Sequence, residues 1–217
     1  MKKLISFSVV TCAMLAPVMA NAAVTADLKL IGKIVPAACA PVFTGGATID
    51  YGNIAASTLS PTEQTLLPEK TTKISVTCAA PVKFAIGLTD ERRASAVTTL
   101  NTIAAYTADM KFGLGTAGNG AKIGAYSLQI SNEVPDTGTT QRLFSDNGGS
   151  TWSVFGGALA VNRIIGFASS STATAPGAHT SITFDVRVVA ALDKTANLPI
   201  TSQLNIDGLS TFEVKYL

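Results

Sequence analysis

The chain has 217 residues, of which 47% are hydrophobic and only 14% are charged, and its formal net charge at pH 7 is +2. This composition excludes a disordered polar chain, because such chains combine high charge with few apolar residues. Beyond the N-terminus, no stretch reaches the roughly 18 uninterrupted apolar residues that a membrane-spanning helix needs. We therefore expect a folded protein that does not insert into a membrane.

The N-terminal segment has the three parts of a secretory signal peptide. Residues 1–3 (MKK) are positively charged, residues 4–19 are apolar, and residues 20–22 (ANA) form a cleavage site of the A-x-A type. We expect residues 1–22 to be removed, so that the mature chain begins at Ala23. The mature chain then has 14 basic residues, two fewer than the full sequence, and 14 acidic residues. A net charge of zero does not attract nucleic acid.

Residues 23–35 alternate between apolar and mostly polar positions. A period of two is typical of a β-strand that presents one apolar face. Alternation does not tell whether the strand joins the protein's own sheet or the sheet of another chain, so both interpretations stay open. The apolar face consists of Ala26, Leu28, Leu30, Gly32 and Ile34, and the other face of Asp27, Lys29, Ile31 and Lys33.

Two cysteines, Cys39 and Cys78, remain after removal of the signal peptide. An even number of cysteines in an exported protein indicates a disulfide, because the compartments outside the cytoplasm are oxidising. We therefore predict a bond between Cys39 and Cys78, with two free buried thiols as the alternative. Zinc needs three or four ligands, so with both cysteines used we expect no metal site and no cofactor.

The rest of the chain is rich in short segments of β-branched and aromatic residues bounded by turn residues, which is typical of an all-β fold. Residues 90–106 contain many Ala and Leu residues, but their Thr and Val residues favour a loop or a single turn. No change of composition marks a boundary, so we expect one domain over residues 36–217. The expected strands are Lys73–Cys78, Val82–Leu88, Ile123–Ser131, Ser181–Val189 and Ser210–Leu217.

Residues 113–118 (GLGTAG) match the pattern G-x-G-x-x-G, and we expect a strand at residues 109–112 before them. In a dinucleotide-binding site this pattern leads into a helix whose N-terminal amides hold a pyrophosphate. Here residues 119–121 (NGA) continue the glycine-rich run instead. We interpret these glycines as turn residues.

Residues 145–152 (SDNGGSTW) are similar to the Asp-box of sialidases, S-x-D-x-G-x-T-W, with Asn147 in place of the aspartate. A single copy of this motif does not make a propeller. We predict a β-hairpin that joins residues 141–144 to residues 152–155, because Asn and Gly accept the positive φ angles of tight turns. The alternative is a sugar-binding site in which Trp152 forms a stacking platform.

His179 is the single histidine of the chain, so a Ser-His-Asp relay would have to use it. Its neighbours Ser181 and Asp185 lack the glycine pattern of a nucleophile elbow. We therefore expect that the protein is not an enzyme. A secreted hydrolase that uses His179 is the alternative.

The C-terminal residues LSTFEVKYL alternate as well, with Phe212, Val214 and Tyr216 on one face of the predicted strand. The sequence ends inside this strand. An apolar strand at the edge of a sheet invites pairing with another chain.

Together these features resemble a pilin subunit of the chaperone–usher pathway. The resemblance is carried by the A-x-A signal, the alternating segment that leads into GKIVPAAC (residues 32–39), the second cysteine in ISVTC and the penultimate tyrosine of the last strand. The middle of the chain, with DYG, FGLG and IGAYSL, is similar to an enterobacterial group of secreted fimbrial-like proteins of undefined function.

The resemblance implies an immunoglobulin-like β-sandwich of the incomplete pilin type, with extra hairpins. The segment 23–35 would be a donor strand that fills the open groove of a neighbouring subunit, which is a form of β-augmentation. Before assembly, a periplasmic chaperone would pair with the last strand and hold the terminal carboxylate. The residues for the chaperone and the acceptor groove would be Phe212, Val214, Tyr216 and Leu217.

We therefore expect a structural subunit of a bacterial surface fimbria. It would be exported through the periplasm to the cell surface, with a chaperone, an outer-membrane usher and other fimbrial subunits as partners. The alternative is a self-contained secreted or periplasmic β-sandwich that binds a ligand such as a glycan, through Trp152 and Tyr126.

Overall fold

The structure is a computed structural model that describes residues 28–33 and 38–217. Residues Pro36–Leu217 form one unit, and residues 28–33 belong to a separate unit. The predicted signal peptide lies outside the described residues, as do Ala26 and Ile34 of the predicted donor strand.

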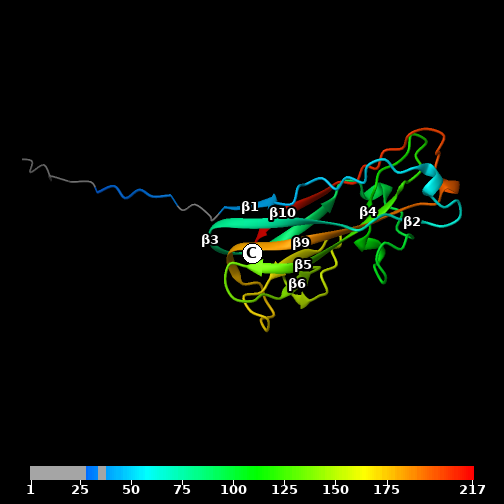
Figure 1. The fold of residues 1–217 in the computed structure, drawn as a ribbon. Helices are drawn as coiled ribbons and strands as arrows, with labels where there is room; N and C mark the ends of the chain where they lie inside the picture. The colour runs from blue at the N-terminus through cyan, green and yellow to red at the C-terminus, as the bar shows by residue number, and fades with distance from the viewer. Residues whose placement is uncertain (1–27, 34–37) are drawn as a thin grey trace, which may run out of the picture. The chain divides into compact units, whose positions relative to one another are not determined.

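The described residues form an all-β fold, as predicted, in which helical structure is limited to short 3-10 turns (Figure 1). The turns are η1 (Ala56–Thr58), η2 (Arg93–Ser95), η3 (Ala108–Met110) and η4 (Thr195–Asn197). The strands are β1 (Cys39–Phe43), β2 (Thr65–Leu66), β3 (Lys70–Asp90), β4 (Phe112–Gly113), β5 (Gly124–Pro135), β6 (Arg142–Ser145), β7 (Ser153–Val154), β8 (Ile164–Phe167), β9 (Ala178–Leu192) and β10 (Ser210–Tyr216).

The five strands predicted from residues rich in β-branched and aromatic side chains are confirmed. Two of them are parts of β3, and the other three correspond to β5, β9 and β10. The short strand predicted at residues 109–112 is wrong, because η3 occupies residues 108–110 and strand pairing begins only at Phe112. The Thr107 hydroxyl donates a hydrogen bond to the Asp109 carboxylate at this turn. Local bonds of this kind compete with the ladder bonds of a strand.

The long strand β3 takes part in two sheets. Its first half pairs with β1 and β9, and its second half pairs with β10 and β8. The register against β9 shifts between Thr77 and Val82. Pro81 lies in this stretch and has no N–H for a ladder hydrogen bond. Prolines within sheets occur at such irregular positions, where regular pairing is interrupted.

The strands form two antiparallel sheets that share β3, which is consistent with a β-sandwich-like fold. One sheet has the order β4-β5-β9-β3-β1 and the other the order β10-β3-β8-β6-β7. Among the described residues, β10 forms ladder hydrogen bonds only with β3, so its other edge has no strand paired to it. The immunoglobulin-like, incomplete form of this fold stays a prediction.

Three phenylalanines join the two sheets across the core. The ring centroid of Phe167 in β8 is 5.4 Å from that of Phe184 in β9 and 6.4 Å from that of Phe84 in β3. All three side chains are buried. Burial of a large apolar side chain stabilises the folded state by about 1.5–3 kcal/mol, so the described strands have a core of their own.

The predicted disulfide is present between Cys39 and Cys78, which lie directly opposite each other in the ladder of β1 and β3. The alternative of two free thiols is therefore wrong. The bond attaches the short strand β1 covalently to β3, the strand that both sheets share.

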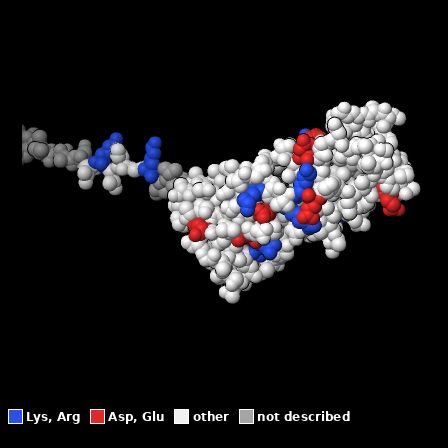
Figure 2. Space-filling model, viewed as in Figure 1, with Lys and Arg blue, Asp and Glu red and all other residues white. Residues whose placement is uncertain are grey.

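Charged side chains of opposite sign lie next to one another on the face shown in Figure 2. Lys73 and Asp185 form an ion pair of 2.9 Å between β3 and β9, and Arg187 binds Glu69 at 2.6 Å. Exposed pairs of this kind contribute little to stability, but they neutralise one another locally.

Within residues 28–33 and 38–217, no helix has the length and hydropathy to cross a bilayer. In the same residues, no three His, Cys, Asp or Glu side chains are arranged to hold a metal ion.

Candidate functional site

The strands β1 and β10 lie side by side, each at the edge of its own sheet (Figure 1). The backbone N–H of Cys39 donates a hydrogen bond of 2.8 Å to the hydroxyl of Tyr216. Further along, the rings of Phe43 and Phe212 meet edge to face, with centroids 5.5 Å apart. These contacts join the two sheet edges over the length of β1.

Beyond Phe43 and Phe212 the two chain segments enclose a groove. One wall lies within residues 47–54, after β1, and the other within residues 200–209, before β10. The groove contains two cavities of about 370 and 590 Å³. The cavities adjoin, since Ile49, Tyr51 and Ile206 line both of them.

The floor of the groove is apolar because it is the inner face of the sheet that contains β5 and β9. Leu128 and Val188 lie under the smaller cavity, and Ile123 and Leu192 lie under the larger one. All four belong to the buried core. The rim of the larger cavity is more polar and includes Asp50, Asn53, Ser202, Gln203 and Asn205.

Most of the backbone of both walls makes no hydrogen bond to other backbone groups. No backbone-to-backbone hydrogen bond begins or ends within residues 47–54 or within residues 201–206, all of which the structure describes. Leu204 and Ile206 pack inwards, while the residues between and beside them are exposed. Alternating side chains and free N–H and C=O groups are the properties of a sheet edge. Residues 47–54 and 201–206 share these two properties with a sheet edge.

The predicted C-terminal site residues lie on or next to β10, at the closed end of the groove. Phe212 and Val214 are half-buried against the core, whereas Tyr216 is 51% exposed. The N–H of Leu217 donates a hydrogen bond to the carbonyl of Lys83. Of these residues, only Phe212 lines the groove itself.

The described part of the predicted donor strand, residues 28–33, forms no strand in this structure. Leu28 is 98% exposed and Leu30 is 96% exposed, and Gly32 lies in the same stretch. Two large apolar side chains two residues apart are thus left in water, which is unfavourable by the hydrophobic effect.

Sequence reasoning missed both walls of the groove. Ile49 and Tyr51 alternate with polar neighbours, and so do Leu204 and Ile206. This alternation is the signal that could have revealed the walls. It extends over too few residues to predict a strand, because strand patterns are reliable only over four residues or more.

Comparison with known proteins gives a family for the chain. A family model described as "Protein of unknown function (DUF1120)" matches residues 28–127. Protein GltF of Escherichia coli (strain K12) is 33% identical in an alignment of 233 positions that covers 92% of this chain and 91% of that protein. The chain belongs to the GltF family. The matched range of the family model contains residues 28–33, β1, β3 and the first wall of the groove.

In this GltF-family chain the glycines of the G-x-G-x-x-G pattern support the second wall of the groove. A Cβ atom on Gly113 would lie 2.0 Å from the carbonyl oxygen of Arg92, and Gly115 has a φ of +88°. The N–H of Asp207 donates a hydrogen bond of 2.9 Å to the carbonyl of Leu114 between them. No helix directly follows the pattern within the described residues. Gly118 lies in a turn as predicted, but Gly113 lies in β4, so the interpretation as a turn residue is wrong for Gly113.

We expect Gly113→Ala to destabilise the fold by about 1–3 kcal/mol, because the added methyl group has no space beside the Arg92 carbonyl. Gly118→Ala is the matched control, since a Cβ there meets no atom within 4 Å. Thermal melting of both variants measures the difference. Equal melting temperatures would mean that the backbone around Gly113 relaxes freely.

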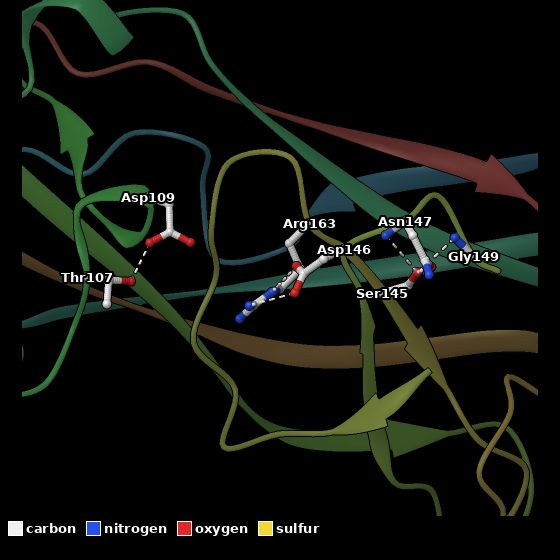
Figure 3. Close-up of polar contacts among 7 residues, drawn as sticks. All are labelled: Thr107, Asp109, Ser145, Asp146, Asn147, Gly149 and Arg163. Carbon is white, nitrogen blue, oxygen red and sulfur yellow. Dashed lines mark hydrogen bonds and ion pairs between the residues drawn. The ribbon is translucent and has the colours of Figure 1, made fainter. Parts of the chain in front are cut away.

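The predicted hairpin is confirmed, with β6 paired to β7. The Ser145 hydroxyl accepts a hydrogen bond of 2.8 Å from the N–H of Gly149 (Figure 3), and the Asn147 side chain accepts one of 3.0 Å from the N–H of Thr151. A Cβ atom on Gly166 would lie 2.8 Å from the ring of Trp152. Part of that ring is therefore packed against β8 instead of being free to stack on a sugar.

His179 is buried, and both of its ring nitrogens face acceptors within the protein. Nδ1 lies 3.2 Å from the carboxylate of Asp136, and Nε2 lies 3.2 Å from the carbonyl of Phe167. The second carboxylate oxygen of Asp136 accepts a hydrogen bond of 2.7 Å from the N–H of Thr180. This arrangement ties the end of β5 to the start of β9 and occupies both ring nitrogens.

We expect Asp136→Asn to lower stability at pH 7 and to remove part of its acid dependence. The backbone N–H of Thr180, with smaller contributions from the side chains of Thr180 and His179, lowers the pKa of Asp136 to about 2. The unfolded carboxyl has a pKa of about 3.9, so its stabilisation is present above pH 4 and is lost as the pH falls towards 2. Denaturant unfolding from pH 7 to pH 2 measures this, with Glu63→Gln as an exposed control. Parallel pH curves for the wild type and Asp136→Asn would contradict the expectation.

Proposed function

We propose that this GltF-family chain is a structural subunit of a bacterial surface fimbria, exported through the periplasm and assembled by strand exchange between subunits. The observation that carries the proposal is the groove with an apolar floor and two walls without main-chain hydrogen bonds at residues 47–54 and 201–206, next to the edge of β10 that has no strand paired to it among the described residues. In β-augmentation an added strand gains affinity from main-chain hydrogen bonds and specificity from pockets for alternate side chains.

The N-terminal segment of a second copy is the occupant that fits the groove. Its alternate positions carry apolar side chains, and two of them, Leu28 and Leu30, are almost fully exposed in the separate subunit. Residues 26–34 span about 30 Å when extended at roughly 3.3 Å per residue. Burial of Leu28, Leu30 and Ile34 at about 1.5–3 kcal/mol each would contribute about 5–9 kcal/mol at most.

A periplasmic chaperone is the proposed partner before assembly, and an outer-membrane usher is the proposed partner during it. The chaperone role is supported by β10, whose backbone pairs only with β3 among the described residues and which ends near the half-exposed side chains of Tyr216 and Leu217. The usher role rests on the resemblance to pilins of the chaperone–usher pathway. An apolar sheet edge without a partner promotes aggregation, so the subunit needs a protein that pairs with this edge in the periplasm.

We expect the double variant Phe212→Ser and Tyr216→Ser to lose chaperone capture and to be degraded in the periplasm, because both apolar side chains on one face of β10 are removed. The double variant Thr211→Ser and Lys215→Ser changes the opposite face and is the control. Co-purification with the chaperone and periplasmic abundance are measured for both. Normal values for the first variant would contradict the chaperone proposal.

A peptide-binding experiment tests the groove directly. The acceptor is the mature chain with Leu30→Asp, which keeps the groove but disables its own donor segment. The probe is a fluorescently labelled peptide of residues 23–36, and the control probe is the same peptide with Leu30→Asp. We expect the wild-type peptide to bind and to raise the melting temperature of the acceptor, because a ligand of the folded state stabilises it. Failure of the wild-type peptide to bind would refute the proposed function.

A further inference from the structure

The hydroxyl of Tyr51 is buried and has no hydrogen-bond partner in the structure. Buried polar groups in proteins are almost always paired, so an unpaired one needs an explanation. The hydroxyls of Tyr126 and Tyr216 do have partners, since they contact Ser210 and the N–H of Cys39. Tyr51 therefore differs from the other two tyrosines near the groove.

The position of Tyr51 connects its unpaired hydroxyl with the groove. The residue lies on the first wall and lines both cavities. The ammonium group of Lys70 lies 5.6 Å from the centroid of the ring, a contact that holds an aromatic ring in place. Burial raises the pKa of the phenol, so the hydroxyl keeps its proton and remains a donor.

The proposed occupant of the groove offers one kind of acceptor to this donor. The face of residues 26–34 that would turn inwards carries Ala26, Leu28, Leu30, Gly32 and Ile34, none of which has a polar side-chain atom. Its main-chain carbonyls are therefore the only acceptors that this face brings with it. Carbonyl groups recur at a fixed spacing along a strand. A donor at a fixed position in the groove therefore favours those positions of the inserted strand that bring a carbonyl within hydrogen-bond distance.

We infer that the Tyr51 hydroxyl donates a hydrogen bond to a main-chain carbonyl of the inserted strand and thereby helps to fix the register of that strand. The inference rests on the proposed function. It assigns Tyr51 a role in specificity that neither the family nor the sequence pattern indicates. Within the chain the hydroxyl has no hydrogen-bond partner, and the inserted strand would supply one.

The test compares Tyr51→Phe with Tyr106→Phe in the Leu30→Asp acceptor chain. Tyr106 is the matched control, because its hydroxyl is also buried without a partner but it lines neither cavity. Removal of an unpaired hydroxyl should leave the melting temperature of each unoccupied chain unchanged or slightly higher. The labelled peptide of residues 23–36 should bind about two- to tenfold more weakly to Tyr51→Phe only, which corresponds to the loss of one hydrogen bond.

A second set of peptides identifies the carbonyl that accepts the bond. Replacing one backbone amide at a time by an ester weakens the carbonyl as an acceptor, and the affected position should cost affinity in the acceptor chain but not in its Tyr51→Phe variant. Equal peptide affinity of the Tyr51→Phe variant and its parent would overturn the inference and leave the proposed function intact. Weaker binding together with a lower melting temperature would also overturn it, since it would indicate a packing role of the ring. Absence of binding to every chain would refute the proposed function itself.

Discussion

Replacing Leu30 by aspartate is expected to abolish assembly into fibres while the subunit keeps its own fold. In the unassembled subunit the side chain is almost fully exposed, so a charge there costs nothing. In the groove of a neighbour the same charge would be buried against an apolar floor, and an unpaired buried carboxylate is strongly unfavourable. The measurements are fibre formation, thermal melting of the chaperone-bound subunit and formation of the Cys39–Cys78 bond.

The neighbouring residue offers a matched control, because Ile31 lies on the opposite face of the predicted donor strand. Ile31→Asp introduces the same charge at a position that should stay outside the groove, and we expect fibres of near-normal length. If Leu30→Asp instead destroys folding and assembly together, residues 23–35 belong to the protein's own core. Fibres of normal length from Leu30→Asp would refute the donor-strand assignment.

Loss of the disulfide is expected to destabilise the subunit by about 4 kcal/mol, as the loop-entropy model gives for a closed loop of about 40 residues. The bonded cysteines are separated by 39 positions. Stabilities of folded domains are about 5–15 kcal/mol, so the loss is a large share of the total. The loop also contains the first wall of the groove, residues 47–54. We expect Cys78→Ser to lower both the melting temperature and the ability to bind the donor peptide.

Two comparisons distinguish the effect of losing the disulfide from the effect of changing the cysteine side chains. The double variant Cys39→Ser and Cys78→Ser leaves no free thiol, and it should melt at the same temperature as the reduced wild type. Thr77→Ser, next to Cys78 on an exposed position of β3, controls for a small polar change in the strand. An unchanged melting temperature of the reduced wild type would show that the bond contributes nothing.

The fold class was predictable because its signal is local. Lys73–Cys78 and Ser181–Val189 alternate over enough residues to reveal strands, and an even cysteine pair predicted the bond that the structure contains. The single strand β3 was predicted as two pieces, since Pro81 and the alanines before it interrupt the pattern. A strand that serves two sheets depends on tertiary packing, which local propensity does not describe.

The candidate site was less predictable than the fold. Phe212 was expected at the groove and lines it, but the walls at Ile49, Tyr51 and Ile206 come from segments about 150 residues apart in sequence. The backbone groups of these walls matter because they lack main-chain partners, and a single sequence has no pattern that predicts a missing partner. The two segments come close together only because the whole β-fold packs them side by side.

The disulfide has a mechanical consequence for a fibre built in this way. Tension between neighbouring subunits would enter each domain through the chain just before β1. The first residue of β1 is Cys39, so in the proposed fibre the load would pass directly through a covalent bond to Cys78 in β3. The hydrogen bonds between β1 and β3 would then carry little of that load. The force would act instead on β3, the strand that both sheets share.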